Sequence, residues 1–166
     1  MKNSRRNGKG IMKIRRWKES DAKAVSDLLA VTLRTTNIKD YSPEQIESLI
    51  QTHQPQHILE RASWTHFYVA CDGEKIIGCG AIGPYWGKVD ESSLFSIFVL
   101  PTYQGMGIGR KIVQTLEQDE YFLRAKRIEI PASITATPFY RKMGYDYKDG
   151  ITTPDFEGLI RLEKFR

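Results

Sequence analysis

The sequence predicts a single-domain α/β fold in which a mixed, mostly antiparallel sheet is flanked by helices. Apolar residues recur with the strand period in some segments and with the helix period in others. These segments follow one another in the order β-α-α-β-β-β-α-β-α-β, and the late strand-turn-helix-strand unit predicts one parallel crossover. With 166 residues, of which 40% are hydrophobic, the chain is long enough to bury one core.

The N-terminal part is predicted to hold one strand and two helices. Residues 11–15 alternate apolar and basic side chains, as a strand with one buried face does. Ser20 and Asp21 offer a cap and an acidic first turn for a helix that ends near Arg34. A second helix is expected from Ser42-Pro43, where a capping residue precedes a proline.

A β-hairpin is predicted for the middle of the chain. Residues 66–71 and 76–82 have strand patterns and flank an Asp72-Gly73 turn. Antiparallel pairing across this turn places Cys71 near Ile76 and leaves Cys79 further along. We therefore interpret both cysteines as free thiols in the core of a cytoplasmic protein.

The C-terminal part is predicted to alternate strands and helices. The strands are expected at residues 94–99, 127–130 and 159–165, with residues 145–148 as an additional short strand. The helices are expected at residues 110–124 and 138–143, the second ending at Gly144.

The positive charge of the chain is concentrated at its N-terminus. The net charge is +5, yet residues 1–18 contain eight basic residues and no acidic one. Residues 1–10 are expected to form a flexible basic leader, and residues 11–166 the folded domain, which is mildly acidic. Nucleic acid is therefore not the expected partner, although the leader could contact one. No apolar run is long enough for a membrane span, and the histidines and cysteines have no metal-site spacing.

Three alternating glycines, Gly105, Gly107 and Gly109, separate a predicted strand from a predicted helix. Their spacing fits neither a nucleotide P-loop nor a dinucleotide-binding fingerprint. A glycine-rich turn before a helix gathers free backbone N–H groups at the positive end of the helix dipole. The pattern therefore predicts a site for a phosphate or pyrophosphate, which can approach a backbone that has no side chains.

Two blocks resemble the GCN5-related N-acetyltransferases (the GNAT family). The segment Gln104-Gly105-Met106-Gly107-Ile108-Gly109 is similar to the [QR]-x-x-G-x-[GA] signature of that family. Residues 136–145, which read ATPFYRKMGY, resemble its A-x-x-F-Y-x-x-x-G-[FY] block. The resemblance covers residues 11–165 and implies an acyl-CoA N-acyltransferase fold with its fourth and fifth strands splayed apart.

The resemblance implies acetyl-CoA as the cosubstrate, with no metal. The glycine turn would bind the pyrophosphate, and the fourth strand would bind the pantetheine arm as an added strand does. Ser133 stands where many relatives have an asparagine that contacts the cofactor. The side chains of Arg110 and Lys111 would reach phosphates or merely face water. The implied cofactor-binding residues are Ile97, Phe98, Val99, Gln104, Gly105, Met106, Gly107, Ile108, Gly109, Arg110 and Ser133.

The resemblance also implies catalytic roles. Tyr140 would be the general acid that protonates the CoA sulfur, the alternative being a core aromatic residue beside Phe139. The N–H of Phe98 or Val99 would meet the thioester oxygen. Three readings of the base stay open: Glu129, whose segment looks like the one that carries the base in ribosomal-protein acetyltransferases, Glu91 acting through a water, or no dedicated base.

The expected acceptor is a primary amine of a small molecule or of a peptide. Residues 35–41 and Tyr85-Trp86 are candidates for the wall of its site, because the family places the acceptor there. The alternative function is a non-catalytic acyl-CoA-binding module or sensor, with the basic leader as a nucleic-acid-binding arm. A homodimer is a further option, since exposed sheet edges often pair in this architecture.

Overall fold

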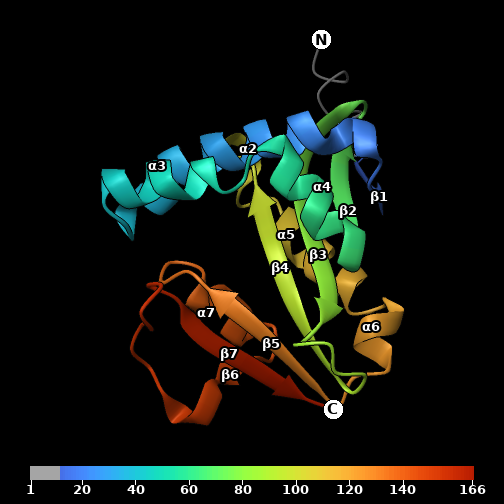
Figure 1. Ribbon diagram of the computed structural model, residues 1–166, viewed down its shortest axis with the longest axis vertical. Coiled ribbons are helices and arrows are strands. Elements are labelled where there is room, and N and C mark those ends of the chain that lie inside the picture. Colours follow the sequence, from blue (N-terminus) through green and yellow to red (C-terminus); the bar gives the residue numbers. More distant parts are fainter. Residues whose placement is uncertain (1–11) are drawn as a thin grey trace.

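The computed structural model describes residues 12–166, which form a seven-stranded sheet flanked by helices (Figure 1). The strands are β1 (Met12–Arg16), β2 (His66–Asp72), β3 (Lys75–Pro84), β4 (Glu91–Val99), β5 (Arg127–Ala132), β6 (Asp146–Tyr147) and β7 (Ile160–Phe165). The α-helices are α2 (Ala22–Thr35), α3 (Pro43–Gln51), α4 (Pro55–Trp64), α5 (Ile108–Leu116), α6 (Glu120–Leu123) and α7 (Thr137–Lys142). Short 3-10 turns are η1 (Glu19–Asp21), η2 (Asn37–Lys39), η3 (Pro101–Tyr103) and η4 (Lys148–Gly150). The predicted basic leader, residues 1–10, lies outside the described residues.

The sheet has the mixed topology that the sequence predicts. Its strand order is β1-β2-β3-β4-β5-β7-β6. The β4–β5 pair is parallel, and every other neighbouring pair is antiparallel. The chain reaches β5 from β4 through α5 and α6, as a parallel crossover requires. The predicted fold class is thereby confirmed.

The central hairpin also has the predicted register. Cys71 pairs with Ile76, and Cys79 lies further along the strand opposite Val69. Both cysteines are buried free thiols. The antiparallel register therefore separates them, as the position of the Asp72-Gly73 turn indicates.

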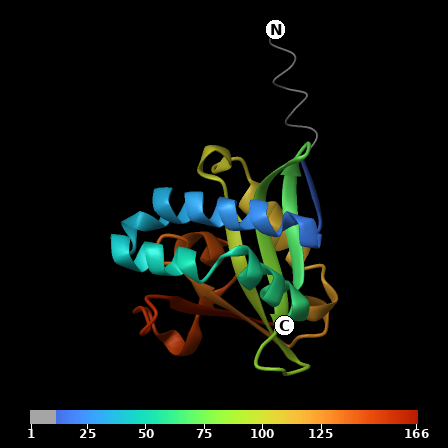
Figure 2. The ribbon, with the colours of Figure 1, turned by 45° about the horizontal axis from the view of Figure 1, so that its top comes forward.

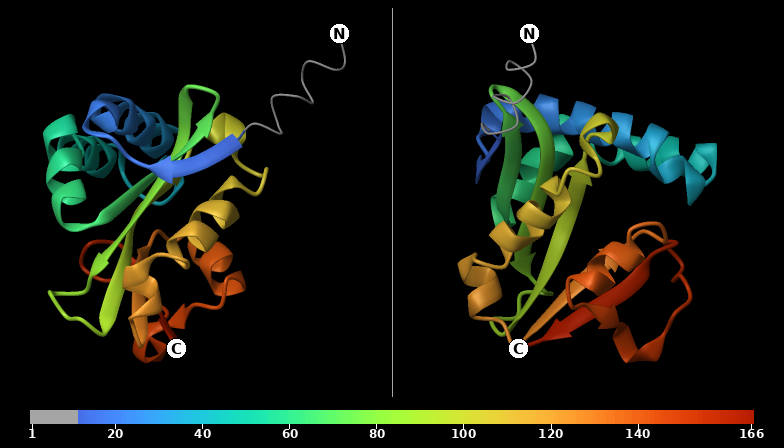
Figure 3. Two further views of the ribbon diagram at one scale, coloured as in Figure 1. Left: turned by 90° about the vertical axis from the view of Figure 1, so that its right-hand side faces the viewer. Right: turned by 180° about the vertical axis from the view of Figure 1, so that it is seen from behind.

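Two helical layers cover the sheet on opposite faces (Figure 3). On one face, α2 and α4 place Leu29 and Ile58 against Phe67 and neighbouring residues of β2 and β3. On the other face, α5 and α7 close a larger core, which includes Ile112 and residues of β5 and β7. The sheet is therefore buried on both faces at its centre.

Helix α5 approaches β3 very closely at Gly80. A Cβ atom built on Gly80 would lie 2.6 Å from Cγ2 of Ile112 and 3.2 Å from Cδ1 of Leu116. Both side chains are buried, and the Ile112 methyl group sits on a branched Cβ, so neither can move aside freely. The absence of a side chain at residue 80 therefore sets the distance between helix and sheet.

Replacing Gly80 by alanine is expected to destabilise the protein by about 1–3 kcal/mol, because the extra methyl group overpacks the core. Urea unfolding followed by circular dichroism measures this change through the transition midpoint. A midpoint equal to that of the parent chain would show that α5 can shift without cost, contrary to the close contact with Ile112.

Two sequence predictions of helices are wrong. The predicted set omits α4, whose apolar pattern is weak because Ile58 is its one buried residue. The single helix predicted at residues 110–124 is two helices, α5 and α6. Asp119 separates them, since its carboxylate accepts hydrogen bonds from the Tyr121 N–H (2.9 Å) and the Tyr68 hydroxyl (2.7 Å). A long-range contact of this kind leaves no periodic signal in the sequence.

Among residues 12–166, no helix is both long and apolar enough to cross a membrane. Over the same residues, no three histidine, cysteine, aspartate or glutamate side chains are grouped as metal ligands.

Candidate active site

The pairing of β4 with β5 ends after three residues. Glu91, Ser92 and Ser93 pair with Arg127, Ile128 and Glu129. Beyond these pairs the two strands diverge, and Figure 1 shows the opening between them. Within residues 12–166, the edge of β4 from Leu94 to Val99 therefore has no partner strand on that side, and the predicted splay is confirmed.

A bulge in β4 lies at this opening. Cys79 pairs with Phe98, whereas Ala81 pairs with Phe95, so β4 holds one residue more than β3 over this stretch. Ser96 takes up the extra length with a left-handed φ of 52°. Its carbonyl accepts a hydrogen bond from the Cys79 thiol at 3.1 Å. Burial raises the pKa of Cys79 to about 12, so the thiol keeps the proton that it donates.

Backbone alternation after the bulge decides which groups face the opening. The N–H of Leu100 donates to the carbonyl of Ile77 on β3 at 2.8 Å. Because successive residues of a strand point their N–H groups to opposite sides, the N–H of Val99 points away from β3. The Val99 carbonyl accepts from Nε2 of Gln104 instead (3.1 Å). Ile97 and Val99 thus direct backbone groups to the opening, and Phe98 directs its own to β3.

The glycine turn presents a row of backbone N–H donors. Gly105 and Gly107 have left-handed φ angles of 78° and 80°, and a Cβ on either would meet no atom within 4 Å. Within residues 12–166, the N–H groups of residues 105–110 have no hydrogen-bond acceptor. The first backbone bond after them runs from the Lys111 N–H to the Gly107 carbonyl at 3.1 Å. Successive donors at the start of α5 therefore border open space, as an anion site requires.

Two of the other residues predicted around this turn, Gln104 and Ile108, fix it in place. Nε2 of Gln104 donates to Oγ1 of Thr36 as well as to Val99, both at 3.1 Å. Ile108 is buried in the main core and anchors the start of α5. The side chains of Met106 and Arg110 are exposed. A Cβ on Gly109 would touch Phe139 at 3.4 Å, so α7 lies against the turn.

Tyr140 projects from α7 with its ring buried in the main core. Burial raises the pKa of its hydroxyl above the usual value, and the nearby Cys79 adds to the shift. The hydroxyl has no hydrogen-bond partner within residues 12–166, although none of the fully buried side-chain N and O atoms there lacks one. It must therefore lie where solvent or a ligand can reach it.

Glu129 lies where the two strands part, in a cluster of cations. Its carboxylate contacts Arg127, Nζ of Lys148 at 2.7 Å and the guanidinium of Arg161 at 3.6 Å. The residue is 1% exposed. Although Glu129 alternates with isoleucines along β5, it is therefore buried as they are. The same arginine, Arg127, also pairs with Glu91 at 3.1 Å.

Two further predicted residues have local partners. Ser133 follows β5, and its hydroxyl accepts a hydrogen bond from the Ala136 N–H at 3.2 Å. Glu91 pairs with Nζ of Lys88 at 2.7 Å, and this bond, together with Arg127, lowers the pKa of the Glu91 carboxyl. A carboxylate with a lowered pKa is a weaker base, which disfavours Glu91 as the proton acceptor.

The candidate acceptor walls are arranged differently. The segment 35–41 spans the opening, because Tyr41 donates to the Gly158 carbonyl (3.0 Å) and Asp40 accepts from Thr135 on the other side. Tyr85 instead lies over the cation cluster, with Arg127 and Lys148 facing its ring at 5.1 and 5.5 Å. Trp86 is 85% exposed.

A pocket that the sequence did not reveal lies between the turn from α3 to α4 and the bulge of β4. Its cavity volume is about 260 Å³, and its lining includes His53, His57, Arg61, Trp64 and Ser96. Figure 2 shows α3 and α4 crossing the face of the sheet where β4 runs. Since α4 itself was not predicted, nothing in the sequence joined these residues to the strand.

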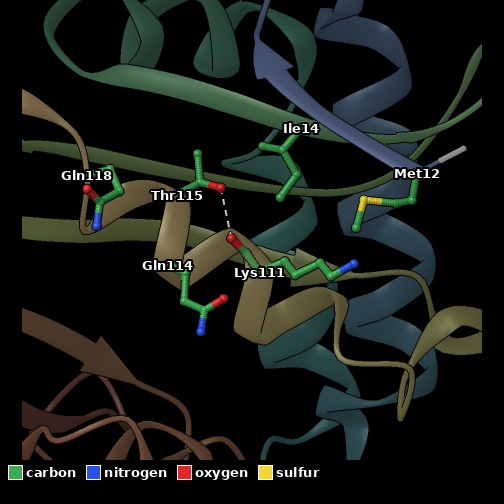
Figure 4. Close-up of a pocket in the computed structure, with 6 residues that line it drawn as sticks. All are labelled: Met12, Ile14, Lys111, Gln114, Thr115 and Gln118. Atoms are coloured by element: carbon green, nitrogen blue, oxygen red, sulfur yellow. Dashed lines mark hydrogen bonds between the residues drawn. The ribbon is translucent and has the colours of Figure 1, made fainter. Parts of the chain in front are cut away.

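A second hollow lies away from the opening, on the face of the sheet that α5 covers. It is a groove of about 400 Å³ between β1 and α5 (Figure 4). Met12 and Ile14 form one side, and Lys111, Gln114, Thr115 and Gln118 form the other. Apart from Lys111, it contains none of the predicted site residues.

An opened sheet beside a glycine turn defines the architecture of an acyltransferase domain. The family model described as the acetyltransferase (GNAT) domain matches residues 63–147, more than half of the chain. The chain therefore belongs to the GNAT acetyltransferase family, which confirms the resemblance of its two sequence blocks.

Comparison with individual proteins gives one short sequence match and many similar folds. The chain is 35% identical over 63 residues to the [ribosomal protein bS18]-alanine N-acetyltransferase of Haemophilus influenzae, a match that spans 43% of that relative's length. A PaiA N-acetyltransferase from Thermoplasma acidophilum, solved with coenzyme A, has a TM-score of 0.79 at 18% identity, covering 93% of this chain and 99% of that one. A GNAT acetyltransferase from Brucella melitensis, solved with acetyl-CoA, has a TM-score of 0.62 at 22% identity, covering 81% and 82%. At these identities the structures show a shared fold.

Proposed function

We propose that the protein transfers the acetyl group of acetyl-CoA to a primary amine. The observation that carries the proposal is the combination of free N–H groups at residues 105–110 with an unpaired β4 edge. Together they offer one continuous backbone surface for a pyrophosphate and an extended amide-bearing arm. Two related folds were solved with coenzyme A or acetyl-CoA, which supports the same ligand here.

The residues fit this cosubstrate. Residues 104–110 would hold the pyrophosphate with backbone N–H groups and the N-terminus of α5. Ile97 and Val99 would bind the arm as a neighbouring strand binds, since their backbone groups face the opening. Arg110 is exposed at the start of α5 and could add a charge contact. Bound there, acetyl-CoA supplies an activated acyl group with a thiolate leaving group.

The proposed transfer is a direct attack by a neutral amine. The amine nitrogen forms a bond to the thioester carbonyl carbon, the carbon–sulfur bond breaks, and the nitrogen loses one proton. The Val99 N–H is the better placed of the two predicted oxyanion donors, because the N–H of Phe98 faces β3. Tyr140 gives its proton to the departing sulfur, and its raised pKa keeps that proton in place beforehand.

The proton of the amine needs an acceptor. An alkylammonium has a pKa near 10.4, so forming the neutral amine at pH 7 costs about 4–5 kcal/mol without help. Glu129 is the proposed base because it forms the last β4–β5 pair, with Ser93. Its carboxylate is already paired with Arg127, Lys148 and Arg161, so these contacts would have to be rearranged for it to accept a proton. Deprotonation without a dedicated base is therefore the alternative.

The experiment that tests the function measures both partners. Calorimetry with acetyl-CoA and coenzyme A tests binding, and release of CoA thiol with a panel of amines and amine-bearing peptides tests transfer. Acetylation of an amine supports the proposal. Binding without transfer to any amine would favour a non-catalytic acyl-CoA-binding module, and absence of binding would exclude both.

Replacing Gly107 by alanine is expected to weaken coenzyme A binding about 10-fold, because the added methyl group enters the space beside the free N–H groups and strains a φ of 80°. Isothermal titration calorimetry measures the loss. The matched control is Gly73→Ala, which also places alanine at a positive φ (61°) in open space, but in the β2–β3 turn. Equal affinities in the two variants would place the pyrophosphate elsewhere.

A further inference from the structure

We infer that the acceptor amine also carries a carboxylate, which pairs with Arg61 in the pocket between α4 and the β4 bulge. The inference rests on the proposed function and names the acceptor of the same site.

Arg61 is a cation held without an anion. Its guanidinium lies over the ring of Phe95 at 4.7 Å and over the ring of Trp64 at 5.5 Å. No carboxylate within residues 12–166 forms an ion pair with it, and no acceptor there takes its N–H groups. Burial lowers the pKa of Arg61 from its ordinary value, yet an arginine stays protonated in proteins. A positive charge is therefore fixed beside the pocket.

Among the described residues, the other half-buried arginines, Arg15, Arg127 and Arg161, each pair with a carboxylate, whereas unpaired arginines such as Arg124 are exposed. Arg127 contacts three carboxylates, among them Glu163 at 2.8 Å. Arg15 and Arg34 each form a close pair with one carboxylate. Aromatic rings orient the plane of a guanidinium group, but unlike a carboxylate they do not accept in-plane hydrogen bonds from its N–H groups. The guanidinium group of Arg61 is thus oriented, and its N–H donors have no acceptor among residues 12–166.

The other titratable groups of the pocket do not cancel this charge. Glu60 lines the pocket and raises the pKa of Arg61 through its charge, but it is exposed and beyond ion-pair distance. Burial lowers the pKa of His53, whose Nδ1 lies 2.7 Å from the Leu49 carbonyl, so its ring is neutral near pH 7. Nδ1 of His57 lies 3.2 Å from the Gln54 N–H and acts as its acceptor.

The pocket extends from Arg61 to the β4 bulge, which lies on the same strand as the proposed oxyanion donor Val99. Ser96 forms part of its wall and belongs to the bulge, three residues before Val99. At about 3.3 Å per residue, the distance along the strand from Ser96 to Val99 is on the order of 10 Å. An acceptor with a carboxylate at Arg61 and an amine a short chain away would span this distance. A cavity of about 260 Å³ suits such a small molecule.

The test compares amines that differ only in the carboxylate. The probes are glycine, β-alanine, 4-aminobutyrate and 5-aminopentanoate, each against the alkylamine of the same chain length, with CoA thiol release as the readout. At least one amino acid is expected to exceed its alkylamine in kcat/KM by about 10-fold or more, since charged hydrogen bonds contribute about 1.5–3 kcal/mol. Preference for the alkylamines throughout would overturn the inference.

Variants of Arg61 assign the effect to its guanidinium. Arg61→Gln should raise KM for the preferred amino acid about 10-fold and leave KM for the alkylamine unchanged. Arg61→Lys keeps the charge without the fork and should restore part of the affinity. The matched control is Arg124→Gln, which removes an arginine that stacks on Tyr121 at 4.5 Å next to α6. An equal change of KM in both glutamine variants would overturn the inference.

A binding measurement separates this inference from the proposed function. The amino acid is titrated into protein saturated with coenzyme A, for the parent chain and for Arg61→Gln. Binding that depends on Arg61 without any acetyl transfer would contradict the function and support the pocket. Transfer with no preference for carboxylates, and no Arg61-dependent binding, would support the function and overturn the inference.

Discussion

Replacing Tyr140 by phenylalanine is expected to lower kcat about 100-fold and to leave the affinity for coenzyme A unchanged. Positioned general acids typically contribute about 10²–10⁴-fold, and a thiolate is a good enough leaving group to favour the lower end. The Tyr140 hydroxyl has no partner in the described part of the chain, so removing it breaks no internal hydrogen bond. Steady-state kinetics with saturating acetyl-CoA, together with calorimetry, measure the two quantities.

The matched control is Tyr145→Phe, in the same sequence block. Tyr145 is also buried in the main core, but its hydroxyl donates to Glu117 at 3.4 Å. Its loss should reduce stability slightly and leave kcat unchanged. A Tyr140→Phe variant that keeps kcat within about twofold of the parent chain would show that Tyr140 is a core residue alone.

The pKa of Tyr140 gives this assignment a pH dependence. Burial raises that pKa above the usual value of 10.0, and a phenol donates a proton only below its pKa. From pH 6 to 9 the hydroxyl of Tyr140 should therefore stay protonated. Any fall of kcat toward alkaline pH in this range should persist in Tyr140→Phe. A basic limb in that range that vanishes in the variant would mean that the pKa is not raised.

The sequence predicted those parts of the site that are continuous in the chain. The glycine turn and the block around Tyr140 are short segments whose chemistry depends on their own backbone and side chains. The same is true of the Asp72-Gly73 hairpin, whose register follows from the turn. Local patterns of this kind need no knowledge of distant residues.

The parts that the sequence did not predict depend on contacts between distant segments. Arg61 and Ser96 line one pocket only because α4 packs beside β4. Two of the cations around Glu129 also reach it only through the fold, because β7 and η4 bring Arg161 and Lys148 to its carboxylate. Charged residues far apart in the chain carry no signal of their pairing, so the cation cluster could not be foreseen.

Replacing Glu129 by glutamine is expected to destabilise the protein by about 3 kcal/mol. Removing one partner of a buried ion pair typically costs about 3–5 kcal/mol, because the remaining charge is left uncompensated. Arg127 keeps its contacts with Glu91 and Glu163, which places the effect at the lower end of that range. Urea unfolding measures the loss. The control is Glu47→Gln, which breaks an exposed pair with Arg34 and should leave the midpoint unchanged.

The same variant decides between the two readings of Glu129. If the carboxylate is the base, the folded variant loses kcat, and the acidic limb of the parent pH–rate profile disappears with it. If the carboxylate only balances Arg127, Lys148 and Arg161, kcat per folded molecule stays near that of the parent chain well below the unfolding midpoint. A loss of stability with no loss of kcat per folded molecule would contradict the proposed role of Glu129 as the base and leave deprotonation without a dedicated base.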